Sequence, residues 1–553
     1  MAFGCLVLLA FSVSGFTLPF DLRGYLDAQL SAGKKRIVVM PGLYVVGPRQ
    51  GVCLSFKNLT NVDIVADGVE MDCAETSRAV NFVNCRNVRL KGLTIDYGPL
   101  PYTEARITAL APDRSWTEIE VIRGYPGLTM VRGVEIYDPA TGELRRETGS
   151  WDTNFDELGH GRYRIFKPKG YRYDAHWDTE QAGDILVANH RSFNGTGDHA
   201  VVADHCVGLK LEDVTLYASP AFGFLEYRCD GSTYLHCKVD RRPQSADPVR
   251  RELRRFRSLN ADAFHSIDAI KGPAIIGCTA KFQGDDCVNI HGTYHMVMAS
   301  HGNQLRVAAL HELGIEPRDA VEFIPYQGLR PPNGSVVKIE PDGPVNEVEK
   351  TFIQALPLDE NIRRGLLSSH AHFYKITVSQ PVALPMGSGI CASERVGNGC
   401  VVRDCDFGYN RSRGIIVKAS RAKVTGNKLT RTWMTAVLVA PEFFWWLEAA
   451  CPDHVLIKDN TIIGCRGAAI EVTARGGDGK PLPAGALRDI IVRDNTIIQS
   501  VRPNIHVTST TGLVLQKNRL TPADDAVFSP PLSVRWEWGT AQPVPVLTEL
   551  CAP

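Results

Sequence analysis

The chain has 553 residues, of which 61 are Lys or Arg and 61 are Asp or Glu, so its formal net charge is zero. A balanced charge offers no electrostatic footprint for a nucleic-acid backbone or an anionic membrane surface, so we expect neither as a partner. Beyond the N-terminus, no segment approaches the roughly 20 apolar residues that span a bilayer, and no membrane span is predicted.

The N-terminus is apolar from Met1 to Phe16 and contains no charged side chain. Val13, Ser14 and Gly15 are small or short residues at plausible cleavage positions. We interpret residues 1–16 as a signal peptide, which predicts a secreted or periplasmic protein. The alternative is that this stretch forms a buried cap on the first coil of the fold.

Short β-branched runs flanked by Asn or Gly recur along the chain and predict strands. They include residues 61–65, 87–95 and 207–216. The 49 Gly and 33 Pro, with few amphipathic patterns of helical period, favour one elongated β architecture. We therefore predict an all-β fold, a right-handed parallel β-helix, with coils over 17–96, 192–293 and 397–553.

The C-terminal third repeats most plainly. Asn427, Asn460, Asn495 and Asn518 follow one another at intervals of 33, 35 and 23 residues. One coil of a parallel β-helix takes about 20 to 29 residues, so the last interval fits one coil and the others fit a coil with a loop. Asn side chains in register can hydrogen-bond from one coil to the next, so these four predict a structural ladder.

Two long stretches interrupt the repeat, residues 97–191 and 294–396. Both contain alternating, hairpin-like runs such as 115–121 and 334–343. Unstructured loops of this length are uncommon in a folded domain, so we predict two inserted antiparallel β subdomains, small and barrel-like. We expect them to wall the functional site or to hold subunits together in a homo-oligomer.

Three acidic residues stand one predicted coil apart. Asp262 is followed 23 residues later by Asp285 and then by Asp286. Side chains one coil apart stack on the same face, so these carboxylates should share one site. Hydrolysis of a glycosidic bond with inversion needs an acid and a base about 6.5 to 9.5 Å apart, and crowded carboxylates keep one member protonated near neutral pH. The alternative is an ordinary Gly-Asp-Asp surface turn.

The sequence around these acids resembles glycoside hydrolase family 110, the exo-acting α-1,3-galactosidases. The resemblance lies in Asn-Ala-Asp-Ala-Phe-His-Ser at 260–266 and Gly-Asp-Asp-Cys-Val-Asn-Ile-His-Gly at 284–292. It implies a right-handed β-helix with barrel-like insertions, inversion of configuration, and no metal or other cofactor. It also implies that Asp285 is the general acid and that Asp262 and Asp286 share the base role through a water molecule.

A more distant resemblance is to the polygalacturonases of family 28. The chain has no Gly-His-Gly downstream of the acids, and it has Arg-Gly-Ile-Ile-Val-Lys at 413–418 where that family has Arg-Ile-Lys. A pectin-cleaving enzyme needs paired cations for its polyanionic substrate, so this departure disfavours the pectinase interpretation.

Further residues could contact a sugar. His265 and His291 flank the acids, and the aromatic run 443–446 could stack on a pyranose ring. The alternatives are structural imidazoles, a ladder amide, solvated surface charges and a subunit interface. The substrate-binding candidates are His265, Asn289, His291, Arg413, Lys418, Glu442, Trp445, Trp446, Glu226 and Glu471.

The cysteines do not point to a metal site. There are 15, with no Cys-x-x-Cys pair, and several precede predicted strands or turns. We expect them to be mostly reduced and buried, and we predict no metal.

The sequence therefore favours an inverting exo-glycoside hydrolase that releases terminal α-1,3-linked galactose from blood-group-B-type or linear α-galactosyl glycans. Galactose-terminated glycans are its expected partners. The alternatives are a polygalacturonase-like hydrolase and a non-catalytic β-helix that binds glycans.

Overall fold

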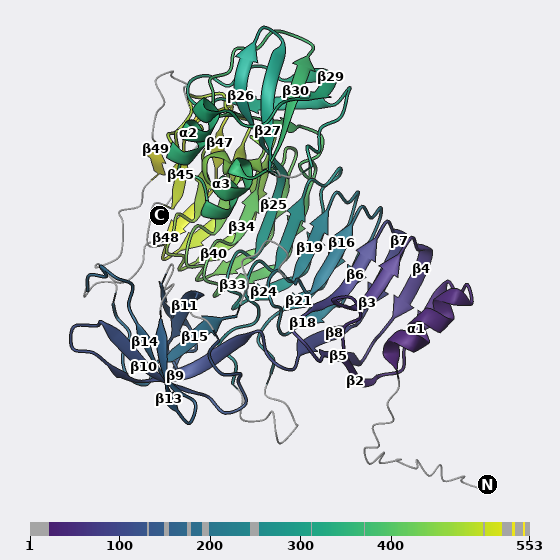
Figure 1. The fold of residues 1–553 in the computed structure, drawn as a ribbon, viewed down its shortest axis with the longest axis vertical. Helices are drawn as coiled ribbons and strands as arrows, with labels where there is room; N and C mark the ends of the chain where they lie inside the picture. The colour runs from purple at the N-terminus through teal and green to yellow at the C-terminus, as the bar shows by residue number, and fades with distance from the viewer. Residues whose placement is uncertain are drawn as a thin grey trace.

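The computed structural model describes residues 21–129, 132–148, 154–173, 178–190, 198–243, 254–310, 312–369, 371–500, 504–521, 534–536 and 546–547. The predicted signal peptide at 1–16 lies outside these residues. Parallel strands in three long sheets form the body of the molecule, which winds as a parallel β-helix (Figure 1). The all-β fold class predicted from the sequence is confirmed.

Successive coils add one strand to each of the three sheets. In spatial order, sheet one contains β1 (Arg36–Val38), β4 (Thr60–Val65), β7 (Arg86–Lys91), β17 (Lys210–Glu212), β20 (Thr233–Leu235), β23 (Ala274–Ile276), β32 (Val401–Arg403), β35 (Lys423–Thr425), β39 (Leu456–Lys458), β43 (Ile491–Arg493), β47 (Val514–Gln516) and β50 (Val546–Leu547). Sheet two contains β2 (Gly42–Val46), β5 (Val69–Cys73), β8 (Thr94–Tyr97), β18 (Thr215–Leu216), β21 (Lys238–Val239), β24 (Thr279–Lys281), β33 (Asp406–Gly408), β36 (Lys428–Thr430), β40 (Thr461–Ile463), β44 (Thr496–Ile498) and β48 (Arg519–Thr521).

Sheet three positions the functional site. It contains β3 (Val52–Lys57), β6 (Arg78–Val83), β16 (Val201–Asp204), β19 (Phe224–Tyr227), β22 (Phe264–Ile267), β25 (Val288–Thr293), β34 (Ile415–Val417), β37 (Val437–Val439), β41 (Ile470–Val472), β45 (Ile505–Val507) and β49 (Val534–Trp536). The short strand β38 (Glu448–Ala449) pairs antiparallel with the C-terminal end of β25, at Gly292 and Thr293. Two further short strands, β42 (Leu487–Arg488) and β46 (Thr510–Thr511), pair with each other.

The first long interruption folds as an antiparallel sheet of seven strands. Their order is β12 (Leu144–Thr148), β11 (Arg132–Tyr137), β15 (Ile185–Asn189), β9 (Tyr102–Leu110), β10 (Trp116–Val121), β14 (Arg162–Phe166) and β13 (Phe155–Gly159). The sheet has its own buried apolar cluster, which includes Ile107, Ile119 and Ile165. It projects from the solenoid at a different place from the second interruption (Figure 1).

The second interruption is a closed antiparallel barrel, as predicted. Its strands are β26 (His295–His301), β27 (Gln304–Ala309), β30 (His372–Val378), β29 (Gly334–Pro341), β28 (Ala320–Ile324) and β31 (Ser388–Ala392). Two helices, α2 (Glu347–Ala355) and α3 (Glu360–Leu367), lie between β29 and β30 in the chain. The remaining described helices are α1 (Leu22–Ser31) and the single turn α4 (Phe443–Trp446). Within the described residues, none of the helices has the length and apolar character needed to cross a membrane.

The solenoid core forms because alternate residues of each strand face inward. In sheet three, Phe224 and Phe264 are in register and stack inside with ring centroids 5.0 Å apart. Asn side chains inside the solenoid hydrogen-bond from one coil to the next. Asn427 Nδ2 donates to Asn460 Oδ1 at 3.0 Å, and Asn460 Nδ2 donates to Asn495 Oδ1 at 2.9 Å. The Asn ladder expected from the repeat intervals is therefore present. The cysteines of the described residues are all buried and free.

Candidate active site

Three aspartates lie together in turns that lead into adjacent strands of sheet three. Asp262 lies just before β22, and Asp286 lies just before β25, so the parallel pairing of these strands stacks the two turns. The Ala263 amide donates to the Asp286 carbonyl at 2.9 Å. One carboxylate oxygen from each of Asp262, Asp285 and Asp286 lies within 4.8 Å of the others. The structure thus brings together the three acids that the sequence spacing singled out.

The turn that carries two of these acids needs a glycine. At Gly284, a Cβ atom would lie 2.9 Å from the Asn260 carbonyl oxygen of the preceding coil. Real Cβ contacts are essentially never shorter than 3.0 Å, so a side chain at this position would push the coils apart. The Gly-Asp-Asp motif therefore allows the close stacking on which the acid cluster depends.

Asp286 is buried and held by Arg413 of the next coil. Its Oδ1 accepts from the Arg413 backbone amide at 2.8 Å and from Nε at 3.2 Å, and its Oδ2 accepts from Nη2 at 3.0 Å. Burial raises the pKa of Asp286 to about 7; Arg413 opposes this shift, and the nearby charges of Asp262 and Asp285 add to it. The Arg413 contacts favour the carboxylate and burial favours the neutral acid, so Asp286 can change its protonation state near neutral pH.

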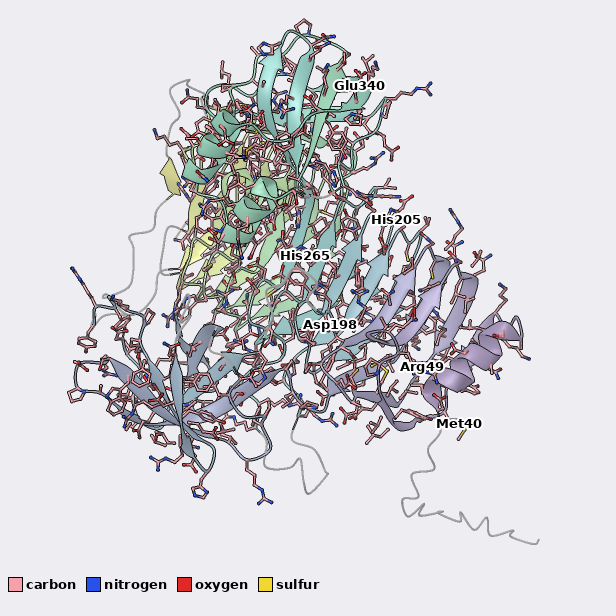
Figure 2. The ribbon with its side chains drawn as sticks, viewed as in Figure 1. Met40, Arg49, Asp198, His205, His265 and Glu340 are labelled. Carbon is pink, nitrogen blue, oxygen red and sulfur yellow. The ribbon has the colours of Figure 1, made fainter. Side chains whose placement is uncertain are left out.

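Asp262 is also buried, and its two oxygens have different partners. Its Oδ1 accepts from the Asp286 amide at 3.3 Å, and its Oδ2 lies 2.6 Å from His265 Nδ1. The His265 ring stacks on Phe222 with centroids 4.3 Å apart. Burial lowers the pKa of His265 to about 4. Figure 2 shows His265 on the body of the solenoid, far from Met40 near its N-terminal end.

Asp285 is the most accessible of the three acids. Its side chain is 27% exposed, and its Oδ2 lies 3.0 Å from Arg411 Nη2. Arg411 was not singled out by the sequence analysis, although it is only two residues before Arg413. The acid cluster therefore reaches the surface at Asp285.

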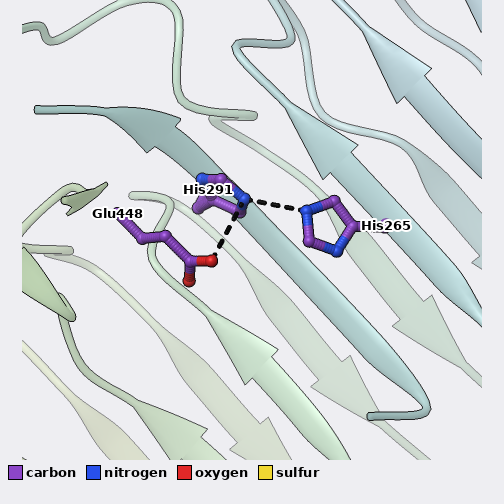
Figure 3. A group of neighbouring side chains, drawn as sticks. All are labelled: His265, His291 and Glu448. Carbon is purple, nitrogen blue, oxygen red and sulfur yellow. Dashed lines mark hydrogen bonds and ion pairs between the residues drawn. The ribbon is translucent and has the colours of Figure 1, made fainter. Parts of the chain in front are cut away.

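A glutamate that the sequence analysis missed completes the site. Glu448 lies on β38, and the pairing of β38 with β25 places it opposite Thr293. Its Oε1 lies 3.6 Å from His291 Nε2, and His291 Nε2 lies 3.0 Å from His265 Nε2 (Figure 3). Burial lowers the pKa of His291 to about 4. Glu448 is two residues beyond the aromatic run in sequence, but only the strand pairing brings it to the histidines.

Lys418 joins this glutamate to the rest of the site. Its side chain is fully buried, and Nζ lies 2.8 Å from Glu442 Oε2, 2.7 Å from Glu448 Oε2 and 3.1 Å from Asn289 Oδ1. Although burial opposes the shift, the two glutamates raise the pKa of Lys418 above its ordinary value. Burial likewise opposes the low pKa of Glu442, which Arg413 and Lys418 produce. Lys418 is thus a buried ammonium that balances two carboxylates.

The contacts close into a ring of eight side chains, which we call the charged ring. It runs through Asp262, His265, His291, Glu448, Lys418, Glu442, Arg413 and Asp286, and returns through the Asp286 amide to Asp262. Each member contacts the next, so the acids belong to a preorganised network of buried and partly buried polar groups. Such a network holds its charges and hydrogen-bonding groups in fixed positions.

The other predicted residues lie in three different settings. Trp445 and Trp446, on α4 next to Glu442, are 43% and 42% exposed. Glu471 contacts Thr435 and His506 rather than the charged ring. Glu226 is buried inside the solenoid, where it accepts from Ser266 at 2.6 Å and from Tyr234 at 3.2 Å. The structure therefore does not bring Glu226 or Glu471 to the acid cluster.

The chain shares sequence similarity with several proteins named as glycosidases. No family model matches the chain. The chain is 25% identical over 441 residues to α-1,3-galactosidase B of Akkermansia muciniphila, which covers 74% of this chain and 49% of that protein. It is 23% identical over 542 residues to α-1,3-galactosidase B of Bacteroides thetaiotaomicron, which covers 92% of this chain and 80% of that protein. The chain is similar to α-1,3-galactosidases.

The resemblance inferred from the two Asp-containing motifs is thereby confirmed. A further relative, α-1,3-galactosidase A of Bacteroides fragilis, is 21% identical over 502 residues, which cover 85% of this chain and 75% of that protein. The chain spans about half the length of the Akkermansia relative. Among solved structures, the endo-xylogalacturonan hydrolase of Aspergillus tubingensis is 10% identical with a TM-score of 0.41, covering 94% of this chain and 95% of that chain. The parallel β-helix is defined by the strand pairing of this chain itself.

Within the described residues, two sets of side chains have ligand atoms close enough to hold a cation: His265 with His291 and Glu448, and the three aspartates. A protein cation already pairs with one carboxylate of each set. Lys418 lies 2.7 Å from Glu448, and Arg411 lies 3.0 Å from Asp285. A divalent ion would have to enter against these fixed charges.

We therefore expect dialysis against EDTA to leave the melting temperature of the protein unchanged. A bound metal stabilises the folded state, so its removal would lower that temperature. Differential scanning calorimetry before and after dialysis, with added Zn²⁺ or Ca²⁺ as the reciprocal control, checks this expectation. A drop on dialysis that one metal reverses would contradict it.

Proposed function

We propose that this chain is an inverting exo-glycoside hydrolase that releases terminal α-1,3-linked galactose from blood-group-B-type or linear α-galactosyl glycans. The observation that carries the proposal is the approach of Asp262, Asp285 and Asp286 to within 4.8 Å, in a chain whose relatives are α-1,3-galactosidases. Clustered carboxylates are the groups that glycosidic hydrolysis requires.

In the proposed mechanism, Asp285 is the general acid. It is partly exposed, so a leaving-group oxygen can approach it. It gives its proton to that oxygen as the bond from the oxygen to the anomeric carbon breaks. A water molecule attacks the anomeric carbon from the opposite face and gives its proton to Asp286 or Asp262. The result is free galactose of inverted configuration and a glycan with one sugar fewer.

The charged ring supports recognition of a neutral sugar. Glu442 and Glu448 can accept hydrogen bonds from sugar hydroxyls, and Arg413 can donate to them, while Lys418 keeps the two glutamates in place. The cations of the ring are already paired with carboxylates at 3.0 Å or less, which leaves little free positive charge for a polyanionic substrate such as pectin. Trp445, exposed beside the ring, offers an indole face on which a pyranose could stack.

The proposal is tested by a linkage screen followed by proton NMR. The protein is incubated with α-1,3-, α-1,4- and α-1,6-linked and β-linked galactosides, and with polygalacturonate. We expect galactose from the α-1,3-linked compounds, with the β-anomer appearing first. No hydrolysis of any α-galactoside would overturn the proposal, and hydrolysis of polygalacturonate instead would favour the pectinase alternative.

The anomer of galactose that appears first distinguishes inversion from retention. This test matters here because the carboxyl groups lie close together. Inverting pairs usually have their carboxyl groups about 6.5 to 9.5 Å apart, and retaining pairs about 5 to 5.5 Å. The 4.8 Å limit for the aspartates concerns one oxygen of each group, so it does not choose between the two outcomes. An α-anomer that appears first would show retention and would refute the base role of Asp262 and Asp286.

The rate should fall as the pH drops below about 7. Asp286, whose pKa burial raises to about 7, must be ionised to accept the proton of water, so protonation removes activity. We expect kcat/KM to fall about tenfold for each pH unit below this value. Arg413 lowers the pKa of Asp286, so Arg413→Gln should move this acidic limb of the pH profile of kcat/KM to higher pH. If the acidic limb does not move in this variant, it reports the titration of a group other than Asp286.

A further inference from the structure

The inserted antiparallel sheet sends one charged side chain toward the acid cluster. Glu135 lies on β11 and is 4% exposed. Its Oε2 accepts from Tyr137 at 2.9 Å and forms an ion pair with Arg257, which is itself 1% exposed. Its Oε1 lies 3.7 Å from Arg411 Nε. Glu135 therefore stands between two guanidinium groups.

Arg411 connects Glu135 to the proposed general acid. Its Nε donates to the Gly284 carbonyl at 2.5 Å, and its Nη2 lies 3.0 Å from Asp285 Oδ2. Its backbone amide donates to the Gln283 carbonyl at 3.2 Å. The side chain is thus fixed along the Gly-Asp-Asp turn, with one carboxylate on each side. Charge alternates along the path from Arg257 through Glu135 and Arg411 to Asp285.

We infer that Glu135 is a positioning residue for Asp285, acting through Arg411, so that the inserted sheet helps to fix the Arg411 charge that faces the acid. This inference rests on the proposed function, because it takes Asp285 as the general acid. A guanidinium beside a carboxylate favours its ionised form, and an ionised Asp285 cannot donate a proton. Glu135 offsets part of the Arg411 charge, and in its absence that charge would act on Asp285 without this offset.

The charged groups that face this path within the described residues come from several elements. Asp285 faces Arg411 from the next coil, its neighbour Asp286, and Asp262 from the preceding coil. Glu135 faces Arg257, Arg411 and its strand neighbour Tyr137. Asp286 is paired with Arg413. Removing the Glu135 charge therefore takes away a carboxylate partner of both Arg257 and Arg411. Asp285 is then the carboxylate of this path that faces Arg411.

The test compares pH profiles of kcat/KM on an α-1,3-galactoside for wild type, Glu135→Gln and Arg411→Gln. Loss of the Glu135 charge should move the basic limb, which reports loss of the acid's proton, to lower pH. Loss of Arg411 should move it to higher pH. Each shift should be on the order of half a pH unit or more. A defect in folding would lower the rate at all pH values and would not move the limb in opposite directions.

A matched control uses another acidic contact between the inserted segment and the solenoid. Glu143 of the inserted segment pairs with Arg431, and neither residue contacts the acid cluster in the structure. Glu143→Gln should leave the basic limb where it is in the wild type. Glu135→Asp keeps the charge and should shift the limb less than Glu135→Gln; it also serves if the Gln variant fails to fold. Equal profiles in all variants, or shifts in one direction only, overturn the inference.

The two proposals fail in different ways. If the wild type hydrolyses no galactoside, the proposed function fails, and the Glu135 inference is then read directly from the carboxyl. Aspartate labelled with ¹³C at Cγ, with the Asp285 signal assigned by its loss in Asp285→Asn, reports the titration of that group. A titration midpoint that falls in Glu135→Gln and rises in Arg411→Gln supports the coupling, and an unchanged midpoint refutes it.

Discussion

Replacing Asp285 with Asn lowers kcat on an α-1,3-galactoside by about 10² to 10⁴, the range that a general acid contributes. Asn has nearly the same shape but cannot give a proton to the leaving oxygen. Asp285 is partly exposed and has Arg411 as its ion-pair partner, so the substitution leaves the charged ring intact. We therefore expect the dissociation constant for galactose, measured by isothermal titration calorimetry, to change little.

A matched control separates loss of the acid from loss of an ion pair. Asp406 lies on sheet two, is paired with Lys281, and has a side chain that is 43% exposed. Asp406→Asn should leave kcat unchanged. If Asp285→Asn retains full turnover, Asp285 has no part in the mechanism. If it loses galactose binding together with turnover, the site is one of recognition and the acid must be sought elsewhere.

The acid cluster could be predicted because a solenoid turns sequence spacing into spatial proximity. Asp262 and Asp286 differ by one coil, and their strands pair in direct register. The same rule predicted the Asn ladder. Both insertions could be predicted to be antiparallel from their hairpin-like runs. The second closes into a barrel, whereas the first forms a sheet of seven strands. Nothing local in the sequence of the first insertion shows whether its sheet closes into a barrel.

The parts of the site that escaped prediction depend on contacts between distant segments. Glu448 reaches His291 only because β38 pairs with β25, and no periodicity marks a two-residue strand. Glu135 reaches Arg411 only through the docking of the inserted sheet. The interior position of Glu226 could have been inferred, since it shares the parity of Phe224 along β19 and Phe224 is a core residue. Strand alternation could therefore have predicted the buried position of Glu226, but it could not predict the position of Glu448.

Lys418→Met should be the most destabilising single substitution in the charged ring. Lys418 is fully buried, and its ammonium is within 2.8 Å of two carboxylates, those of Glu442 and Glu448. Its removal leaves both without this cation, and breaking a buried pair in this way costs about 3 to 5 kcal/mol of unfolding free energy. Urea denaturation at neutral pH measures the loss. The control is Lys458→Met, at a partly exposed pair with Asp459, where we expect less than about 1 kcal/mol.

The pH dependence of this loss identifies its cause. In the wild type the pKa values of Glu442 and Glu448 are low; burial opposes this shift, and Lys418 contributes to it in both cases. Without the ammonium, burial dominates, so both glutamates take up protons in the folded state at higher pH than before. The variant should therefore regain stability relative to the wild type as the pH falls and these carboxyls become neutral. Adding Glu448→Gln to Lys418→Met should recover part of the loss in the same way. A loss of unfolding free energy that does not depend on pH and is not relieved by Glu448→Gln would instead indicate a packing defect. In that case the charge balance of the ring does not stabilise this part of the solenoid.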